Sequence, residues 1–182
     1  LRVYTLFMGD YASAAPWSES SVKGCKRFLD RVAGLTELVR DTGATPSLES
    51  AFHKTVKKVT DDIEDMKFNT AIAAMMGLLN DIYENGSLTR DELVTFISLL
   101  CPFAPHLCEE IWEGLGGKGF LSLAPWPEYD ENKTVDDEIE IAVQICGKLR
   151  ATIRIPRELP KDEAIAAAKA DEKIAAMLQG KQ

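Results

Sequence analysis

Residues 52–80, FHKTVKKVTDDIEDMKFNTAIAAMMGLLN, contain the pattern that decides the fold of this chain. Apolar residues recur there at three- and four-residue steps, which is the period of an amphipathic helix. The spacing predicts one helix over 48–66 and another over 69–83, with Asn85 and Gly86 ending the second. Successive helices with connections this short are typical of a helical bundle.

The same period continues on both sides of this stretch. Upstream, it predicts a long helix over 20–40, with Ser18 or Ser20 as the N-cap and Gly43 as the end. This helix would place a second apolar stripe against the pair described above.

Two further helices are expected downstream. Thr89 and Glu92 match the S/T-x-x-E capping box at the start of a helix over 89–100. A short helix over 106–115 follows two prolines that break the periodicity. About five helices are therefore expected before residue 116, with no strand among them.

The composition changes after residue 116. Residues 116–133 are rich in glycine and proline and are interpreted as a linker. Apolar and polar side chains then alternate over 139–145 and 149–155, which predicts two strands in a hairpin turning near Gly147. An alanine-rich helix is expected after Pro160.

The expected fold class is mainly α. A helical bundle over 1–130 is followed by a small, truncated α+β domain over 131–182. Two strands and one helix make a thin core, because an isolated hairpin is marginal in water. The sequence opens on Leu1 inside an apolar pattern, so we expect a segment of a longer chain, cut within structure at both ends.

Length and charge limit the possible functions. The 182 residues carry 21 Lys and Arg against 29 Asp and Glu, a formal net charge of −8. This balance argues against a protein whose whole surface binds nucleic acid, yet it allows local basic rows. The longest run of apolar residues and glycine, Ala71 to Leu79, is far shorter than the about 20 residues that span a membrane. No membrane partner is expected.

The cysteines indicate a reducing compartment, so the expected location is the cytoplasm. Cys25, Cys101, Cys108 and Cys146 form no C-x-x-C pair, and each lies in an apolar context typical of a free, buried thiol. A disulfide framework is the less favoured interpretation, because stapled chains are usually smaller and richer in cysteine. Zinc at Cys101, His106 and Cys108 would lack a fourth ligand at finger-like spacing, so no metal is expected.

Two other patterns could take part in chemistry. Residues 114–119 match G-x-G-x-x-G, but a nucleotide-binding loop follows a strand and opens a helix, whereas this run follows a helix. Asp61 and Asp65, one turn apart in an acidic cluster, could do acid–base work if burial separated their pKa values. An acidic run on an amphipathic helix is more often a solvated face. No catalytic residue is expected in this chain.

Basic residues form two rows at helical spacing. The first basic row comprises Lys23, Lys26, Arg27 and Arg31, and the second basic row comprises Lys54, Lys57 and Lys58. Neighbours of the same sign four residues apart repel each other, so such rows are better tolerated beside an anionic partner such as a polyphosphate backbone. The alternative is a set of solvated side chains neutralised by nearby acidic residues.

Five segments, taken in order, resemble the C-terminal third of the bacterial leucyl-tRNA synthetases. They are APWSESSVKGCKRFLDRV (15–32), the stretch 52–80, LLCPFAPHLCEEIWEGLG (99–116), PWPEYDE (125–131) and VQICGKLRATIRIP (143–156). The helical part alone would also suit the related isoleucyl and valyl enzymes. HKTVKKVTDDIE together with Q-x-x-G-K-L-R favours the leucyl enzymes.

The resemblance implies a class I synthetase anticodon-binding domain, followed by the start of the small C-terminal domain that reaches the tRNA elbow. That family ligates leucine to tRNA(Leu) with ATP and Mg²⁺, through leucyl-adenylate, in a catalytic domain that lies upstream with the editing domain. This segment would therefore be catalytically silent. Its implied partners are tRNA(Leu) and the enzyme's own catalytic domain, and DNA is not among them.

The resemblance also implies where tRNA binds. Both basic rows are expected to contact phosphates along the stem, with Lys148 and Arg150, on one face of the hairpin by strand alternation, near the elbow. Cys146 stands where the family commonly has Asn, and the family continues into further strands beyond residue 182. The alternative from another class is a helical protein-interaction module with an apolar surface patch and no RNA role.

Overall fold

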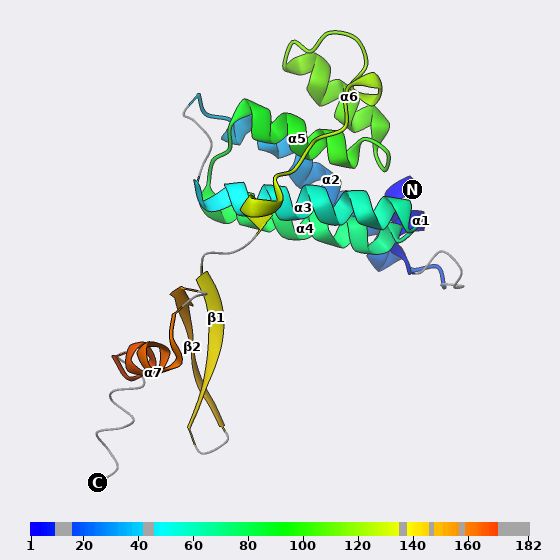
Figure 1. Ribbon diagram of the computed structural model, residues 1–182. Coiled ribbons are helices and arrows are strands. Elements are labelled where there is room, and N and C mark those ends of the chain that lie inside the picture. The colour runs from blue at the N-terminus through cyan, green and yellow to red at the C-terminus, as the bar shows by residue number, and fades with distance from the viewer. Residues whose placement is uncertain (10–15, 42–45, 135–137, 146–147, 157–158, 171–182) are drawn as a thin grey trace. The chain divides into compact units, whose positions relative to one another are not determined.

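The computed structural model describes residues 1–9, 16–41, 46–134, 138–145, 148–156 and 159–170 (Figure 1). The chain divides into two compact units, Leu1–Thr134 and Val135–Gln182. The division lies just beyond the expected boundary at residue 130. Within the described residues, no helix has the length and apolar character needed to cross a bilayer.

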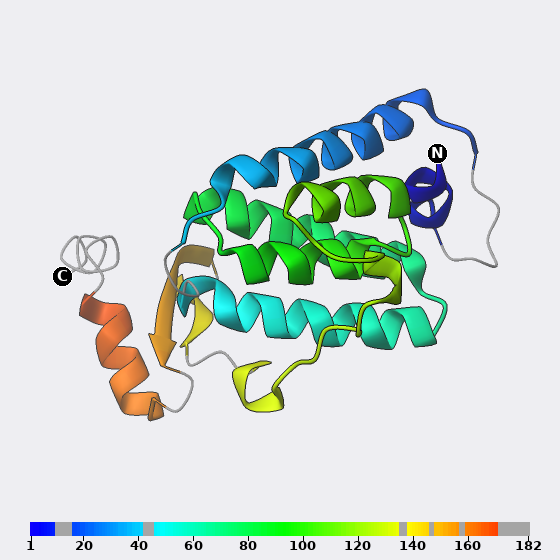
Figure 2. The same ribbon diagram turned by 90° about the horizontal axis from the view of Figure 1, so that it is seen from above.

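The first unit is built from helices, as the apolar periodicity predicted. Its elements in chain order are α1 (Arg2–Phe7), α2 (Glu19–Ala33), the 3-10 helix η1 (Gly34–Leu38), α3 (Pro46–Glu64), α4 (Phe68–Asn85), α5 (Arg90–Leu100), α6 (Pro105–Gly114) and the 3-10 helices η2 (Leu121–Leu123) and η3 (Glu131–Thr134). The stretch that decides the fold supplies α3 and α4, which lie side by side (Figures 1 and 2).

Three helix ends confirm the predicted caps, whereas Gly43 lies outside the described residues. The Ser18 hydroxyl accepts a hydrogen bond from the Ser21 amide at the start of α2. Thr89 and Glu92 form the expected capping box, with each side chain accepting from the other residue's amide. Gly86 ends α4 with a φ of 76°, a left-handed conformation that glycine adopts without strain.

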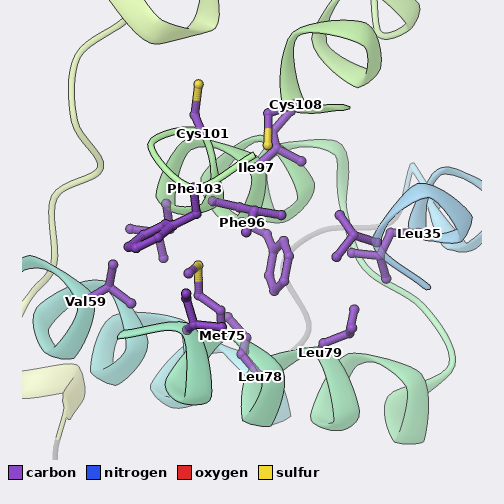
Figure 3. Packing of buried hydrophobic residues seen from close by; sticks show 14 of the residues in the cluster. Leu35, Val59, Met75, Leu78, Leu79, Phe96, Ile97, Cys101, Phe103 and Cys108 are labelled. Atoms are coloured by element: carbon purple, nitrogen blue, oxygen red, sulfur yellow. The ribbon is translucent and has the colours of Figure 1, made fainter. Parts of the chain in front are cut away.

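The core of the first unit lies between α3, α4 and α5, with α2 and η1 closing one side. Phe96 of α5 and Phe103, just after it, pack over Met75 and Leu79 of α4, while Leu35 of η1 reaches the same cluster (Figure 3). All five side chains are almost completely removed from solvent. Burial of this size is the main stabilising contribution in a helical bundle, so the basic residues lie on a rigid support.

α1 is an element that the sequence did not indicate. Tyr4, which is buried, accepts a hydrogen bond from the Ser18 amide through its hydroxyl at 2.9 Å. Its ring also meets the edge of Trp17, with 4.9 Å between the ring centroids. These contacts hold α1 against the start of α2, and α1 also packs against α4.

The predicted helix over 20–40 is shorter than expected. α2 ends at Ala33, and η1 continues the chain to Leu38. The Tyr83 hydroxyl of α4 donates to the Arg31 carbonyl at 2.8 Å. Carbonyls in the last turn of a helix lack a partner within the helix, so this hydrogen bond from α4 satisfies one of them where α2 ends. Gly34 fits there because an added Cβ would lie 3.0 Å from that hydroxyl.

The interpretation of residues 116–133 as a linker is wrong. The Glu109 carboxylate of α6 accepts from the Leu121 and Ser122 amides at 2.8 and 2.9 Å, and Leu121 is buried. Further along, Trp126 donates from Nε1 to the Thr60 hydroxyl of α3 at 2.8 Å. Glycine and proline shape the local turns, but the polar anchors hold this segment against the bundle.

The second unit contains the predicted hairpin and helix. β1 (Glu138–Ile145) pairs antiparallel with β2 (Lys148–Pro156), and α7 (Lys161–Ala170) follows and contacts β2. The ladder pairs Val143 with Ala151 but Gln144 with Leu149, so Arg150 is skipped. This bulge interrupts the strict alternation on which the expected shared face of Lys148 and Arg150 relied.

Candidate nucleic-acid interface

The first basic row lies along the exposed side of α2. Lys23 and Arg27, one turn apart, are both exposed. Within the described residues, neither side chain forms a hydrogen bond or an ion pair. Two adjacent cations without a carboxylate repel each other weakly, and an external anion would relieve that repulsion.

Arg31 is held at the C-terminal end of the same row. Its guanidinium donates to the Asn80 side-chain oxygen at 2.8 Å and lies over the Tyr83 ring, 4.5 Å from the centroid. An amide and an aromatic face leave the positive charge unneutralised while they fix its position. Arg31 is therefore a preorganised cation at the junction of α2 and α4.

Lys26 differs from the other members of the first basic row. It forms an ion pair with Asp30 at 2.6 Å, four residues further along the helix. Both side chains are well exposed, and water and salt screen such a pair. Lys26 can therefore exchange this partner for a phosphate at little cost.

The second basic row is engaged within the protein. Lys57 forms an ion pair with Glu131 of η3 at 2.8 Å, and its Nζ lies 5.6 Å from the centroid of the Tyr129 ring. The hydrogen bond with Glu131 raises the pKa of Lys57, so this lysine stays charged. Lys54, earlier in α3, is half-buried.

Lys58 is bound more firmly than Lys57. Its ammonium contacts both carboxylate oxygens of Asp62 at 2.6 Å, and Asp62 is buried. The same carboxylate accepts from the Thr70 hydroxyl of α4 at 2.7 Å. Lys58 therefore compensates a buried charge at the junction of α3 and α4, which is a structural role.

The two basic rows are not brought together in the fold. Viewed from above, α2 and α3 run along opposite edges of the first unit, and α5 and α6 lie between them (Figure 2). Lys148 and Arg150 belong to β2 of the second unit, and their side chains lie outside the described part of the structure. The geometry thus isolates the first basic row as a separate electropositive surface.

Comparison with known proteins identifies the family. The anticodon-binding domains of tRNA ligases match residues 47–165, from α3 into α7. The chain belongs to this family. Two curated leucine–tRNA ligases align with the whole chain, including α2: that of Alkaliphilus oremlandii (strain OhILAs) at 44% identity and that of Bdellovibrio bacteriovorus at 46%.

The chain spans about a quarter of these relatives, 23% and 24% of their lengths. A solved structure agrees with this assignment. It is a ternary complex of Agrobacterium radiobacter K84 agnB2 LeuRS with tRNA and LeuAMS, similar to this chain with a TM-score of 0.73 and 29% identity. The likeness covers 97% of this chain and 25% of that one.

The glycine run of this anticodon-binding domain does not fit a nucleotide phosphate. It ends α6 and turns through Gly116 and Gly119, which have φ values of 76° and 70°. A Cβ on Gly117 would lie 2.0 Å from the Trp112 ring, so Gly117 is required for packing. The run thus packs against α6 and does not open a helix. Among the described residues, no three His, Cys, Asp or Glu side chains converge on one point.

The cysteines of the anticodon-binding domain are structural. Cys25, Cys101 and Cys108 are free and buried, and desolvation raises the pKa of each thiol. A thiol with a raised pKa is a poor nucleophile and a poor metal ligand near neutral pH. Cys146 lies outside the described residues.

Sequence reasoning missed the residues that support the interface. Asn80 and Tyr83 of α4 hold Arg31, yet the sequence placed them only within the predicted helix over 69–83. Met76 and Asn80 face α2 from one side of α4, one turn apart. No local signal pairs them with α2, because the contact joins segments about fifty residues apart.

Proposed function

We propose that this domain docks tRNA along the first basic row, as part of a leucine–tRNA ligase. The observation that carries the proposal is the state of Lys23 and Arg27, which are exposed on α2 and have no partner among the described residues. Arg31 extends the same row as a cation held in place. Phosphates spaced along an RNA backbone suit such a row.

Several findings support the wider proposal. The relatives that align with the whole chain are leucine–tRNA ligases, and the similar solved structure contains tRNA. We place the ATP- and Mg²⁺-dependent joining of leucine to tRNA(Leu) in the rest of the ligase, which would work in the cytoplasm. The anticodon-binding domain would contribute position and affinity.

The physical basis of docking is electrostatic. Each lysine or arginine that meets a phosphate releases condensed counterions, so affinity falls steeply as salt rises. Such contacts orient the RNA but read no bases, because every nucleotide presents the same phosphate. The net charge of −8 disfavours RNA binding over the whole surface, so the contacts are expected at local groups of basic residues.

Contacts near the tRNA elbow from Lys148 and Arg150 remain part of the proposal. Contacts from the second basic row are weaker candidates, because Lys57 and Lys58 would first have to leave Glu131 and Asp62. A buried carboxylate left without its lysine is costly.

A second surface favours a protein partner. Phe120, just before η2, and Leu123, the last residue of η2, expose 68% and 81% of their surface, and Trp126 nearby exposes 38%. Exposed apolar side chains gathered on one segment are typical of a protein contact. We assign this contact to the ligase's own catalytic domain. The anticodon-binding domain would then bind both tRNA and a protein partner, through two different surfaces.

A direct binding measurement tests the tRNA proposal. Fluorescence anisotropy with labelled tRNA(Leu) transcript should show tighter binding by the native chain than by Lys23→Glu or Arg27→Glu. The matched control is Lys118→Glu, which makes the same charge change at an exposed position outside the row. Equal losses for all three variants would mean that only net charge matters, and the proposed surface would be wrong.

A charging assay tests the amino-acid assignment. The ligase containing this segment should attach leucine to tRNA(Leu) and should leave the isoleucine and valine tRNAs uncharged. Preferential charging with isoleucine or valine would move the chain to one of those ligases.

A further inference from the structure

A groove lies beside the first basic row, between α1, α2 and α4. It has a volume of about 440 Å³ and is open to solvent on one side. Phe7 of α1, Phe28 of α2 and Met76 of α4 give it largely apolar walls. Such a volume is in the range of sites for small organic groups. The phosphate contacts proposed for the first basic row do not involve this groove.

The edge of the groove is polar and positively charged. Arg27 and Arg31 line it from α2, and Asn80 lines it from α4. Asn80 accepts from Arg31 through its side-chain oxygen, so its NH₂ group remains a donor at the edge. No carboxylate is among the lining residues in the described part of the chain. The groove therefore combines an apolar interior with cationic and amide groups at its rim.

We propose that this groove receives one unpaired nucleobase of a bound RNA, while the first basic row holds the neighbouring phosphates. A nucleotide combines a base, which has apolar faces and polar edges, with an anionic phosphate backbone, and each of these features has a counterpart here. Aromatic, thioether and guanidinium groups stack on base faces, and an amide pairs with base edges. The proposal rests on the RNA-docking role and adds a contact that can distinguish paired from unpaired regions.

Charge decides between a base and a peptide as the occupant. An apolar peptide side chain could fill the walls, but it would leave the two guanidinium groups at the rim without an anion. A nucleotide brings its own phosphate to that rim. Lys23 belongs to the same row on α2 and has no partner among the described residues. It therefore continues the row of cations along which the phosphates of an RNA strand would lie.

Gly24 makes the proposal testable without damage to the fold. It lines the groove from the interior of α2, and a Cβ built there meets nothing within 4 Å. Gly24→Leu would fill the groove, and leucine is a better helix former than glycine. Gly77 of α4 also has open space around it but does not line the groove, so Gly77→Leu is the matched control.

The probes are three RNA hairpins that differ at a single site: one has a bulged adenosine, one has an abasic residue in the same bulge, and one is fully paired. The native chain should bind the adenosine hairpin about tenfold more tightly than the abasic hairpin, as expected for one stacked base. Gly24→Leu should reduce this ratio to less than about twofold and leave binding of the abasic and paired hairpins unchanged. Gly77→Leu should keep the native ratio.

Equal affinity of the native chain for the adenosine and abasic hairpins would overturn the inference, as would a ratio that survives Gly24→Leu. If Gly24→Leu melts below the native chain, Gly24→Gln fills the same space and replaces it in the comparison. Failure of the docking role looks different, because none of the three hairpins would then show salt-dependent binding and Lys23→Glu would have no effect. A groove that serves a peptide instead would leave salt-dependent binding intact but equal for the adenosine and abasic hairpins, which overturns the inference alone.

Discussion

α2 and α3 carry similar rows of basic residues and use them differently. On α2, Lys23 and Arg27 are exposed without partners among the described residues, and Arg31 is held by an amide and an aromatic ring. On α3, Lys57 and Lys58 each meet a carboxylate, and one of these, Asp62, is buried. The same spacing thus yields a surface for an external anion on one helix and internal ion pairs on the other.

The comparison shows that the role of a basic residue depends more on its partner within the protein than on its spacing along the helix. A lysine bound to a buried carboxylate stabilises the fold and is costly to recruit for another ligand. A lysine with no partner, or with an exposed one such as Asp30, is available.

The largest expected effect comes from removing the buried carboxylate of α3. Asp62→Ala should lower the free energy of unfolding by about 2–3 kcal/mol, because Lys58 loses its partner and the Thr70 hydroxyl keeps only the Lys67 carbonyl as an acceptor. Asp30→Ala removes the exposed partner of Lys26 on α2 and should cost less than about 0.5 kcal/mol. Urea unfolding followed by circular dichroism measures both. Similar losses would mean that the two pairs are equivalent.

Charge reversal on α2 should affect function more than neutralisation on α3. Lys23→Glu with Arg27→Glu should lower kcat/KM for leucylation about thirtyfold, mainly through KM, since two phosphate contacts become repulsive. Lys57→Gln should change it by less than about twofold, because this lysine is occupied by Glu131. Steady-state charging kinetics at low salt provide the measurement. A larger loss from Lys57→Gln would reverse the ranking of the rows.

Two glycines of the α2 region should respond with opposite sign. Gly24→Ala should raise the free energy of unfolding by about 0.8–1 kcal/mol, because the site is helical with free space. Gly34→Ala should lower it by about 1 kcal/mol, because its Cβ would displace the Tyr83 hydroxyl from the Arg31 carbonyl. Thermal melts of both variants test the prediction. Stabilisation by both would show that Tyr83 does not hold α2.

The smallest expected effect is on the pH dependence of stability, through Glu109, which holds the segment after α6. Desolvation alone would raise the pKa of Glu109, but the amides of Ser122 and Leu121 donate to its carboxylate and lower the pKa below its ordinary value of 4.5. A lowered folded-state pKa gives stability that is present above pH 4.5 and is lost as the pH falls below it.

Glu109→Gln should therefore reduce the fall in melting temperature at acid pH, while the exposed neighbour Glu110→Gln should change it less. Fluorescence of Trp112, whose Nε1 donates to the Gly119 carbonyl, should report release of the segment in the native chain. Identical pH profiles for the native chain and Glu109→Gln would contradict this role.

Local patterns made most of the helices predictable. The capping box at Thr89 and Glu92 and the N-cap at Ser18 involve residues three apart, so the sequence alone contains both partners. The pairing of Lys58 with Asp62, four residues later, could be predicted in the same way. The burial of Asp62 could not be predicted from the sequence, because it depends on how α4 packs against α3.

Long-range contacts account for what could not be predicted. Lys57 meets Glu131 across 74 residues, and Arg31 meets Asn80 across 49. Residues 116–133 have the glycine and proline content of a linker, but Glu109 and Thr60 hold them in place. Leu121 and Trp126 within that segment were the available signal, since large apolar residues are unusual in a solvated linker.

The salt dependence of tRNA(Leu) binding tests the difference between the two rows most directly. The native chain, Lys23→Gln with Arg27→Gln, and Lys57→Gln with Lys58→Gln should be titrated against the same transcript over a range of KCl concentrations. The α2 double variant should have a log–log slope about two units shallower than the native chain, because each lost phosphate contact removes about 0.9. The α3 double variant should keep the native slope; a shallower slope for it, with an unchanged slope for the α2 variant, would contradict the assignment of tRNA docking to α2.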